Sequence, residues 1–206
     1  MLVEWSRRFA DPARVLDLGC GDGRGVDVVR ACLPDAQYDG VDIEQSPEVS
    51  SRSRDDARFH SYDGVNLPFD DKTFDIVYSR QVFEHVRHPD RLAAEVCRVL
   101  KPGGAFVGSL AYLEPYHSYS IFNFTPYGLF RVGEDNGLRV REMRPGVEGL
   151  SLIMRQMSMR RIRGFGIAYP LIGLLARLRS LGVRERNYLK LRFAGHICFA
   201  MEREQD

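Results

Sequence analysis

The sequence has few of the features that mark a disulfide-rich, zinc-binding or membrane-spanning protein. Its four cysteines are dispersed along 206 residues, with no C-x-x-C pair and no histidine spacing suited to zinc. We therefore predict reduced thiols and no metal site. The apolar stretch from Phe165 to Ala176 has about a dozen residues and is interrupted by Pro170 and Gly173, whereas a bilayer-spanning helix needs roughly twenty. What remains is a globular chain, most simply one domain, long enough to bury a sizeable core.

The first ten residues also lack the apolar core of a secretory signal. They contain Glu4, Arg7 and Arg8 instead. We therefore expect no signal peptide and a cytoplasmic location, where reduced cysteines are the normal state.

Net charge is small, at +1, but it is unevenly distributed. Residues 151–192 contain a single acid, Glu185, and ten basic residues, so the rest of the chain is acidic. Such asymmetry predicts a basic segment with its own partner, which could be a membrane surface, an anionic substrate or the acidic body of the protein. The ten are Arg155, Arg160, Arg161, Arg163, Arg177, Arg179, Arg184, Arg186, Lys190 and Arg192.

A glycine-rich turn follows the first apolar run, and the rest of the chain is organised around it. Residues 15–18 show no alternation and predict a buried strand. The glycines at 19, 21, 23 and 25 then mark a turn that takes a positive φ or lies close to a ligand. The dinucleotide spacing G-x-G-x-x-G fails, because Arg24 and Val26 occupy the two positions open to a third glycine. Asp17 would also repel a pyrophosphate and suits a cationic ligand, so an NAD-dependent oxidoreductase is disfavoured.

This combination of Asp17 with G-x-G-x-G resembles motif I of the class I S-adenosylmethionine-dependent methyltransferases. The segments D-x-x-x-LPF from Asp63, FDIVYSRQVFEHV from Phe74 and RLAAEVCRVLKPGG from Arg91 are similar to the common methyltransferase domain, so the resemblance covers about residues 15–109. It implies S-adenosylmethionine as the cofactor, which is cationic where NAD is anionic. It also implies a Rossmann-like α/β fold: a seven-stranded sheet of order 3-2-1-4-5-7-6, with the last strand antiparallel and helices on both faces.

Two acids lie at or just after the ends of predicted strands, on the side of the sheet where the cofactor is expected. Asp42 ends the strand predicted at 38–43 and lies 21 residues beyond Gly21, where a doubly wound fold places the carboxylate that accepts from ribose hydroxyls. Asp63 follows the strand predicted at 58–62. It is either an acceptor for the adenine amine or a turn residue before Gly64.

The resemblance also places the segment after the fourth strand over the methionine end of the cofactor. The predicted cofactor-binding residues are Asp17, Gly19, Cys20, Gly21, Gly23, Asp42, Ile43, Asp63, Gly64, Ser79, Arg80 and Gln81.

The hydrophobic pattern and the turn residues predict the remaining elements. Strands are expected at 13–18, 38–43, 58–62, 74–79, 105–110, 138–143 and 195–202, and helices at 25–33, 90–100 and from Thr125 to about Gly137. Some fifty residues separate the last two strands, and helical periods cover 150–163 and 169–181 within them. We therefore predict one domain, 1–206, with a short N-terminal segment at 1–12, an acceptor-side insertion at 111–131 and a basic helical insertion at 147–192.

Candidate bases lie near the predicted methyl end of the cofactor. His85 follows the fourth strand, and His117 lies in an aromatic segment, 112–127, that is either an acceptor-pocket wall or ordinary core. Each histidine is a candidate general base, with a hydrogen-bonded packing role as the alternative. His60 and His196 lie in predicted strands and are given no role.

The predicted function is S-adenosylmethionine-dependent methylation of a small molecule, with O-methylation of a sugar or lipid-linked metabolite favoured. C- or N-methylation of a quinone-like or other metabolite is one alternative. A non-catalytic scaffold subunit at a membrane is another. Nucleic acid is not expected as a partner, because no recognised DNA- or RNA-binding module accompanies the arginines. The segment 147–192 is expected to act as a lid, as a homodimer surface or in peripheral membrane contact.

Overall fold

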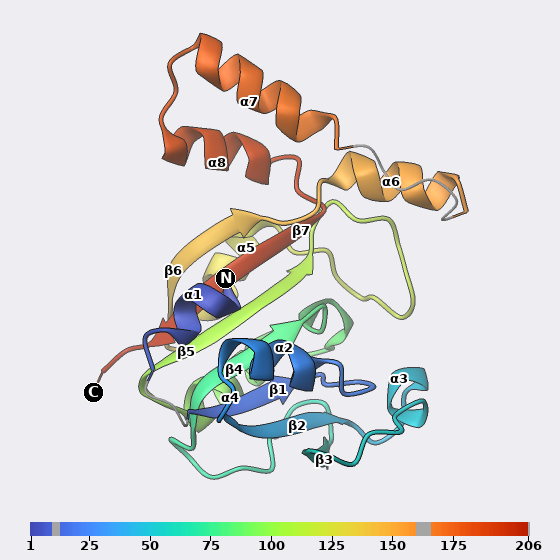
Figure 1. Ribbon diagram of the computed structural model, residues 1–206, viewed down its shortest axis with the longest axis vertical. Coiled ribbons are helices and arrows are strands. Elements are labelled where there is room, and N and C mark those ends of the chain that lie inside the picture. Colours follow the sequence, from blue (N-terminus) through green and yellow to red (C-terminus); the bar gives the residue numbers. More distant parts are fainter. Residues whose placement is uncertain (10–12, 160–165, 206) are drawn as a thin grey trace.

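Seven strands form one sheet whose order is β3-β2-β1-β4-β5-β7-β6 in the computed structural model, which describes residues 1–9, 13–159 and 166–205 (Figure 1). Neighbouring strands from β3 to β5 are parallel, whereas β7 is antiparallel to both β5 and β6. The predicted fold class is therefore confirmed. The strands are β1 (Arg14–Leu18), β2 (Gln37–Ile43), β3 (Arg58–Tyr62), β4 (Phe74–Arg80), β5 (Leu100–Ala111), β6 (Leu138–Pro145) and β7 (His196–Arg203).

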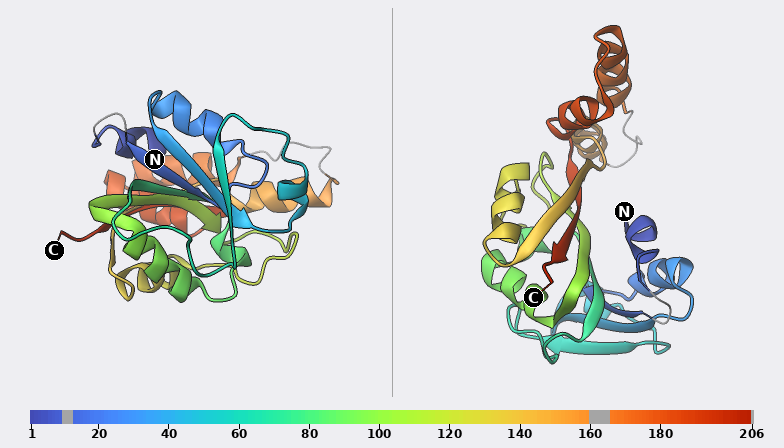
Figure 2. Two further views of the ribbon diagram at one scale, coloured as in Figure 1. Left: turned by 90° about the horizontal axis from the view of Figure 1, so that it is seen from below. Right: turned by 90° about the vertical axis from the view of Figure 1, so that its left-hand side faces the viewer.

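Helices cover both faces of this sheet (Figure 2). Their apolar positions recur every three or four residues, which places them on one side of each helix; α4, for example, buries Leu92, Val96 and Val99. One apolar core lies beneath α4 and α5, and a second lies beneath α1 and α2. The helices of the sheet body are α1 (Leu2–Ser6), α2 (Gly25–Cys32), α3 (Pro47–Ser50), α4 (Pro89–Val99) and α5 (Pro126–Glu134), with a 3₁₀ turn η1 (Phe83–His85).

One strand is longer than its pattern predicts. The expected strand 105–110 is wrong at its start, because β5 already begins at Leu100 and passes through Pro102-Gly103-Gly104. Gly103 has a φ of +75°, and the pairing of β4 with β5 changes register between Phe74 and Ile76. The glycines thus produce an irregularity within the strand and not its boundary.

A helical arm connects β6 to β7 and consists of α6 (Gly149–Met157), α7 (Ala168–Leu178) and α8 (Val183–Leu191). Figure 1 and the right-hand view of Figure 2 show α7 and α8 standing beyond the end of the sheet, away from α2 and α4. The helix predicted at 150–163 ends earlier, at Met157, and its residues 160–163 lie outside the described part of the chain, as do residues 10–12 of the predicted N-terminal segment. Among the described residues, no helix is long and apolar enough to cross a membrane.

A buried glutamate fixes the base of this arm. Glu148 is only 3% exposed, and its carboxylate accepts from the Ser151 hydroxyl at 2.9 Å and from the Tyr169 backbone N–H at 2.9 Å. Glu148 also pairs with Ala194, just before β7. The same carboxylate therefore holds the start of α6 and the start of α7 at the end of the sheet.

Candidate active site

The turn between β1 and α2 requires glycine where its backbone has a positive φ and lies closest to neighbouring side chains. Gly19, Gly21 and Gly23 have φ values of +74°, +49° and +86°, which side chains disfavour. A Cβ at Gly19 would overlap the Val82 side chain, so the segment after β4 packs directly on the turn. The turn is thus a close-fitting cradle at the carboxyl ends of the central strands, where ligands of open α/β sheets bind.

Asp17 lies beneath this turn, at the end of β1. Its side chain is 4% exposed, and the Tyr38 hydroxyl donates to Oδ2 at 2.6 Å. Burial raises the pKa of the Asp17 carboxyl to about 6, although Tyr38 and the more distant Arg80 favour the charged form. A cationic ligand above the turn would stabilise the ionised carboxylate in the same way.

Asp42 is held against the turn by two backbone amides. Oδ2 accepts from the Gly21 N–H at 2.7 Å, and Oδ1 accepts from the Ile43 N–H at 2.7 Å. The side chain is partly exposed, and each carboxylate oxygen has a second lone pair. Asp42 is therefore an oriented bidentate acceptor beside the glycine turn.

Cys20 and Ile43, which were also predicted to bind the cofactor, differ in their exposure. Cys20 is buried, and burial raises the pKa of its thiol to about 12, so the sulfur is a neutral packing group. Ile43 is 42% exposed and offers apolar surface next to Asp42.

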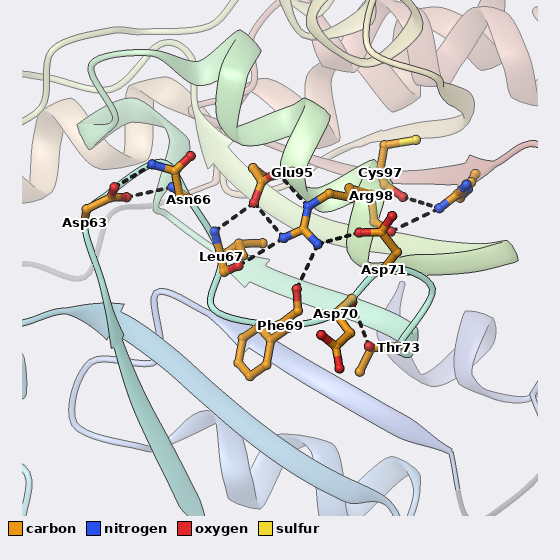
Figure 3. A network of polar contacts seen from close by, with 11 residues as sticks. Asp63, Asn66, Leu67, Phe69, Asp70, Asp71, Thr73, Glu95, Cys97 and Arg98 are labelled. Atoms are coloured by element: carbon orange, nitrogen blue, oxygen red, sulfur yellow. Dashed lines mark hydrogen bonds and ion pairs between the residues drawn. The ribbon is translucent and has the colours of Figure 1, made fainter.

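Asp63 occupies the turn role that was its alternative interpretation. Its Oδ1 accepts from the backbone N–H groups of Val65 and Asn66, and its Oδ2 accepts from the Asn66 amide (Figure 3). These bonds, led by the Asn66 side chain, lower the pKa of the Asp63 carboxyl. Asp63 is exposed and precedes Gly64, whose φ is +89°. The carboxylate is thus fixed and ionised, and its contact with adenine stays a prediction.

The loop that follows Asp63 is fastened by α4. Glu95 accepts from the Leu67 N–H at 2.9 Å, while the Arg98 guanidinium donates to the carbonyls of Leu67 and Phe69 (Figure 3). Glu95 and Arg98 also form an ion pair. The LPF segment is therefore held rigidly beside the predicted adenine side.

The segment after β4 contacts the glycine turn through Val82. The three residues predicted there to bind the cofactor lie in different environments. Ser79 is buried, and its hydroxyl has no hydrogen-bond partner among the described residues. Arg80 is exposed. Gln81 has a φ of +56° and donates its backbone N–H to the Ser109 carbonyl. The strained backbone at Gln81 re-aims the chain towards the turn; the cofactor roles of these three residues stay predictions.

A cluster of histidines and glutamates lies beside this segment, and sequence reasoning found only two of its members. The rings of His85 and His117 meet edge to face, with centroids 5.5 Å apart. Glu114 lies 3.7 Å from His117 Nδ1 and its carboxylate accepts from His196 Nε2 at 2.7 Å. Glu84 completes the group and is fully buried. Glu84 and Glu114 are isolated acids in the sequence; the E-H pair at 84–85 was the available signal.

These residues fit S-adenosylmethionine, the cofactor of the family that motif I resembles. The ribose has two hydroxyls for the two oxygens of Asp42, which are held beside the glycine turn. Asp17 supplies a negative charge for a cationic ligand. These residues therefore complement S-adenosylmethionine in hydrogen bonding and in charge.

Comparison with known proteins points the same way. A family model described as a methyltransferase domain matches residues 16–108. The phthiotriol/phenolphthiotriol dimycocerosates methyltransferase of Mycobacterium tuberculosis is 38% identical over 96 residues, covering 45% of this chain and 36% of that protein. The fatty-acid O-methyltransferase of Mycolicibacterium smegmatis is 35% identical over 97 residues, covering 46% and 35%. The chain thus matches about a third of the length of these curated relatives.

Solved structures share the fold over nearly the whole chain. The [4+2]-cyclase SpnF superimposes with a TM-score of 0.67 at 18% identity, over 100% of this chain and 80% of that one. A geranyl diphosphate methyltransferase in complex with S-adenosylmethionine gives a TM-score of 0.63 at 16% identity, over 98% and 82%. The solved structures thus show that the chain shares their fold, and the family model shows that residues 16–108 are similar to a methyltransferase domain.

Proposed function

We propose that the protein transfers a methyl group from S-adenosylmethionine to a hydroxyl oxygen of a small molecule, a sugar or a lipid-linked metabolite. The observation that carries this proposal is that the glycine turn and Asp42 lie at the carboxyl ends of β1 and β2, while the cluster of imidazoles and carboxylates follows the carboxyl ends of β4 and β5. A cofactor site and a set of bases thus lie at the same end of the sheet. Hydroxyls are poor nucleophiles and benefit from such a base.

The chain's own residues would bind, orient and deprotonate. Asp42 would accept from the ribose beside the glycine turn, where Gly19 is packed against Val82. The bound cofactor supplies an electrophilic methyl group. His85 and His117 are both half-buried and their rings are in contact, so either is a candidate proton acceptor.

The acceptor side is bounded by the segment 112–124 and α6. Tyr116, Tyr119 and Phe122 are exposed, whereas Phe124 is buried in the core. The Gln156 amide donates to the Tyr116 carbonyl at 3.2 Å, which connects α6 to this segment. The aromatic segment is therefore partly core and partly apolar surface, which suits an acceptor with an apolar portion. The names of the two curated relatives, which refer to dimycocerosates and fatty acids, support a lipid-linked acceptor.

Label transfer tests the function directly. Methyl-labelled S-adenosylmethionine is incubated with the protein and a lysate extract, which is then divided into organic and aqueous phases. We expect label in the organic phase, and Asp42→Ala should abolish it because the ribose acceptor is lost. Aqueous label would point to a soluble sugar or metabolite. Absence of label despite measured cofactor binding would contradict the proposal; the same fold also serves a [4+2]-cyclase, so the fold alone does not imply methyl transfer.

We also propose that the arm contacts an anionic membrane surface from the cytoplasmic side. Leu171, Leu174, Leu175 and Leu178 of α7 follow a helical i, i+3, i+4, i+7 pattern, and all four are exposed, by 48% to 74%. The exposed Arg177, Arg179 and Arg184 lie on or next to the same helix. An apolar stripe flanked by arginines is typical of a helix lying in a membrane interface.

Replacing Leu174 and Leu175 together by serine should weaken binding to phosphatidylglycerol vesicles about tenfold or more, since each buried leucine contributes roughly 1.5–3 kcal/mol. Co-sedimentation measures the binding. Val3→Ser, an exposed position on α1, is the matched control and should leave it unchanged. Equal binding by the double variant would contradict membrane contact. Loss of a concentration-dependent dimer in light scattering would instead assign the stripe to a homodimer.

A further inference from the structure

Five titratable side chains from separate segments meet at the acceptor end of the sheet. Glu84 and His85 belong to η1 after β4, Glu114 and His117 follow β5, and His196 begins β7. The order of the strands brings these segments together, so the sequence shows only the pairs 84–85 and 114–117 and not the whole group. Our expectation of no metal site was drawn from short spacings.

Three members of the group offer ligand atoms to one point. One atom each from Glu84, His85 and His117 lies within 4.8 Å of the others. A metal bound at about 2.0–2.2 Å brings its ligand atoms to roughly 3.0–3.4 Å of one another. His85 and His117 are only half-buried, so rotation of their side chains can supply the remaining closure.

Glu84 provides an independent indication of a ligand. Its side chain is fully buried, and its Oε2 has no hydrogen-bond partner among the described residues. Buried polar atoms are nearly always satisfied, and one left open costs free energy unless something binds there. The residue is also held in place, since the backbone N–H groups of Ile121 and Phe122 donate to the Glu84 carbonyl at 2.6 Å and 3.1 Å.

The charges around this point favour a cation. The Glu84 carboxylate is fully buried here, and the Glu114 carboxylate lies against His196 and His117. Two carboxylates are thus gathered with imidazoles as their neighbours. A bound dication would stabilise both carboxylates in their ionised form.

Glu114 has the geometry of an orienting group. Its carboxylate lies between His196 Nε2, at 2.7 Å, and His117 Nδ1, at 3.7 Å. Metal-ligating histidines usually direct their second ring nitrogen to a carboxylate, which fixes the tautomer and the ring direction. Glu114 is hydrogen-bonded to His196 and lies within ion-pair distance of His117, where it would orient that ring once the ion is bound.

We propose that Glu84, His85 and His117 bind one divalent transition-metal ion. Two imidazoles and one carboxylate suit Zn²⁺, Fe²⁺, Mn²⁺ or Co²⁺, whereas Mg²⁺ and Ca²⁺ prefer oxygen ligands throughout. Three protein ligands leave coordination positions open. If the proposed methyltransferase function holds, on which this last step rests, the acceptor hydroxyl fills one of them, and the ion would take over from His85 and His117 the task of favouring its deprotonated form.

Titration of the metal-free full chain with Co²⁺ or Zn²⁺ tests the site. We expect one ion per chain by calorimetry and a visible absorption band for the Co²⁺ complex. Glu84→Gln and His117→Asn should each weaken binding about tenfold or more, in line with the loss of a ligand. His88→Asn, an exposed histidine near His85 but outside the group, is the matched control and should bind like the original chain.

Two results would overturn the proposal: no stoichiometric binding, or binding that both ligand variants leave unchanged. Preference for Mg²⁺ over Zn²⁺ would overturn the assigned class of metal. Affinity for S-adenosylhomocysteine is measured on the same samples and verifies that each variant is folded. Metal binding without methyl transfer would refute the proposed function and leave the metal site standing, so the two failures are distinguishable.

Discussion

Asp42→Ala is expected to weaken the binding of S-adenosylhomocysteine about 100-fold or more. The carboxylate is already fixed by the N–H groups of Gly21 and Ile43, so it accepts from two ribose hydroxyls without further ordering. Each hydrogen bond to a charged acceptor contributes roughly 1.5–3 kcal/mol, and two of them correspond to at least about 3 kcal/mol. Alanine also releases the Gly21 N–H and loosens the turn. Isothermal titration calorimetry measures the affinity directly.

Asp35→Ala is the control for this substitution. Asp35 is an exposed aspartate that precedes β2 at the opposite end of the strand from Asp42. We expect it to leave both affinity and thermal stability unchanged. If Asp42→Ala bound S-adenosylhomocysteine almost as well as the original chain, the ribose role of Asp42 would be wrong, and the glycine turn would need another partner.

The sequence was sufficient for the sheet because its strands are short apolar runs between strong turn signals. Residues 58–62 were predicted with the bounds that β3 has, and α2 begins at Gly25 as expected. The match of Asp42 to the turn was also predictable, since a fixed distance along a βαβ unit brings the end of β2 beside the end of β1. The hydrogen bond from the Gly21 N–H to the Asp42 carboxylate is the contact that results from that spacing.

The arm and the acid–histidine cluster could not be predicted in the same way. Helix α8 was missed because its sequence, VRERNYLKL, is polar and has no clear apolar face. Glu114 and His196 are 82 residues apart, and their contact exists only because β7 returns beside β5. Long-range pairing of this kind depends on the connection between strands and leaves no local period in the sequence.

Asp17→Asn is expected to stabilise the fold at neutral and alkaline pH. Burial is the main reason that the pKa of Asp17 is raised from its ordinary value of 3.8 to about 6. In the unfolded chain the carboxyl ionises near pH 4, whereas in the folded chain it holds its proton until about pH 6. The favourable contribution of the protonated group is therefore complete below about pH 4 and is lost as the pH rises through about 6. Asparagine keeps an acceptor for the Tyr38 hydroxyl and carries no charge to bury.

Urea unfolding at about pH 4 and about pH 8 measures this effect. The variant should be more stable by roughly 1–3 kcal/mol at the higher pH, which follows from a shift of about two pKa units, and the gain should shrink towards zero at the lower one. Asp27→Asn supplies the contrast, because the exposed Asp27 bonds to Arg54 and has a lowered pKa, so its loss should be slightly destabilising at the higher pH. Affinity for S-adenosylmethionine should fall in Asp17→Asn, since the negative charge beneath the turn is gone. A variant that gained no stability at the higher pH would show that Asp17 is ionised at no cost in the folded protein, and one that gained stability without losing affinity would separate the buried charge from cofactor binding.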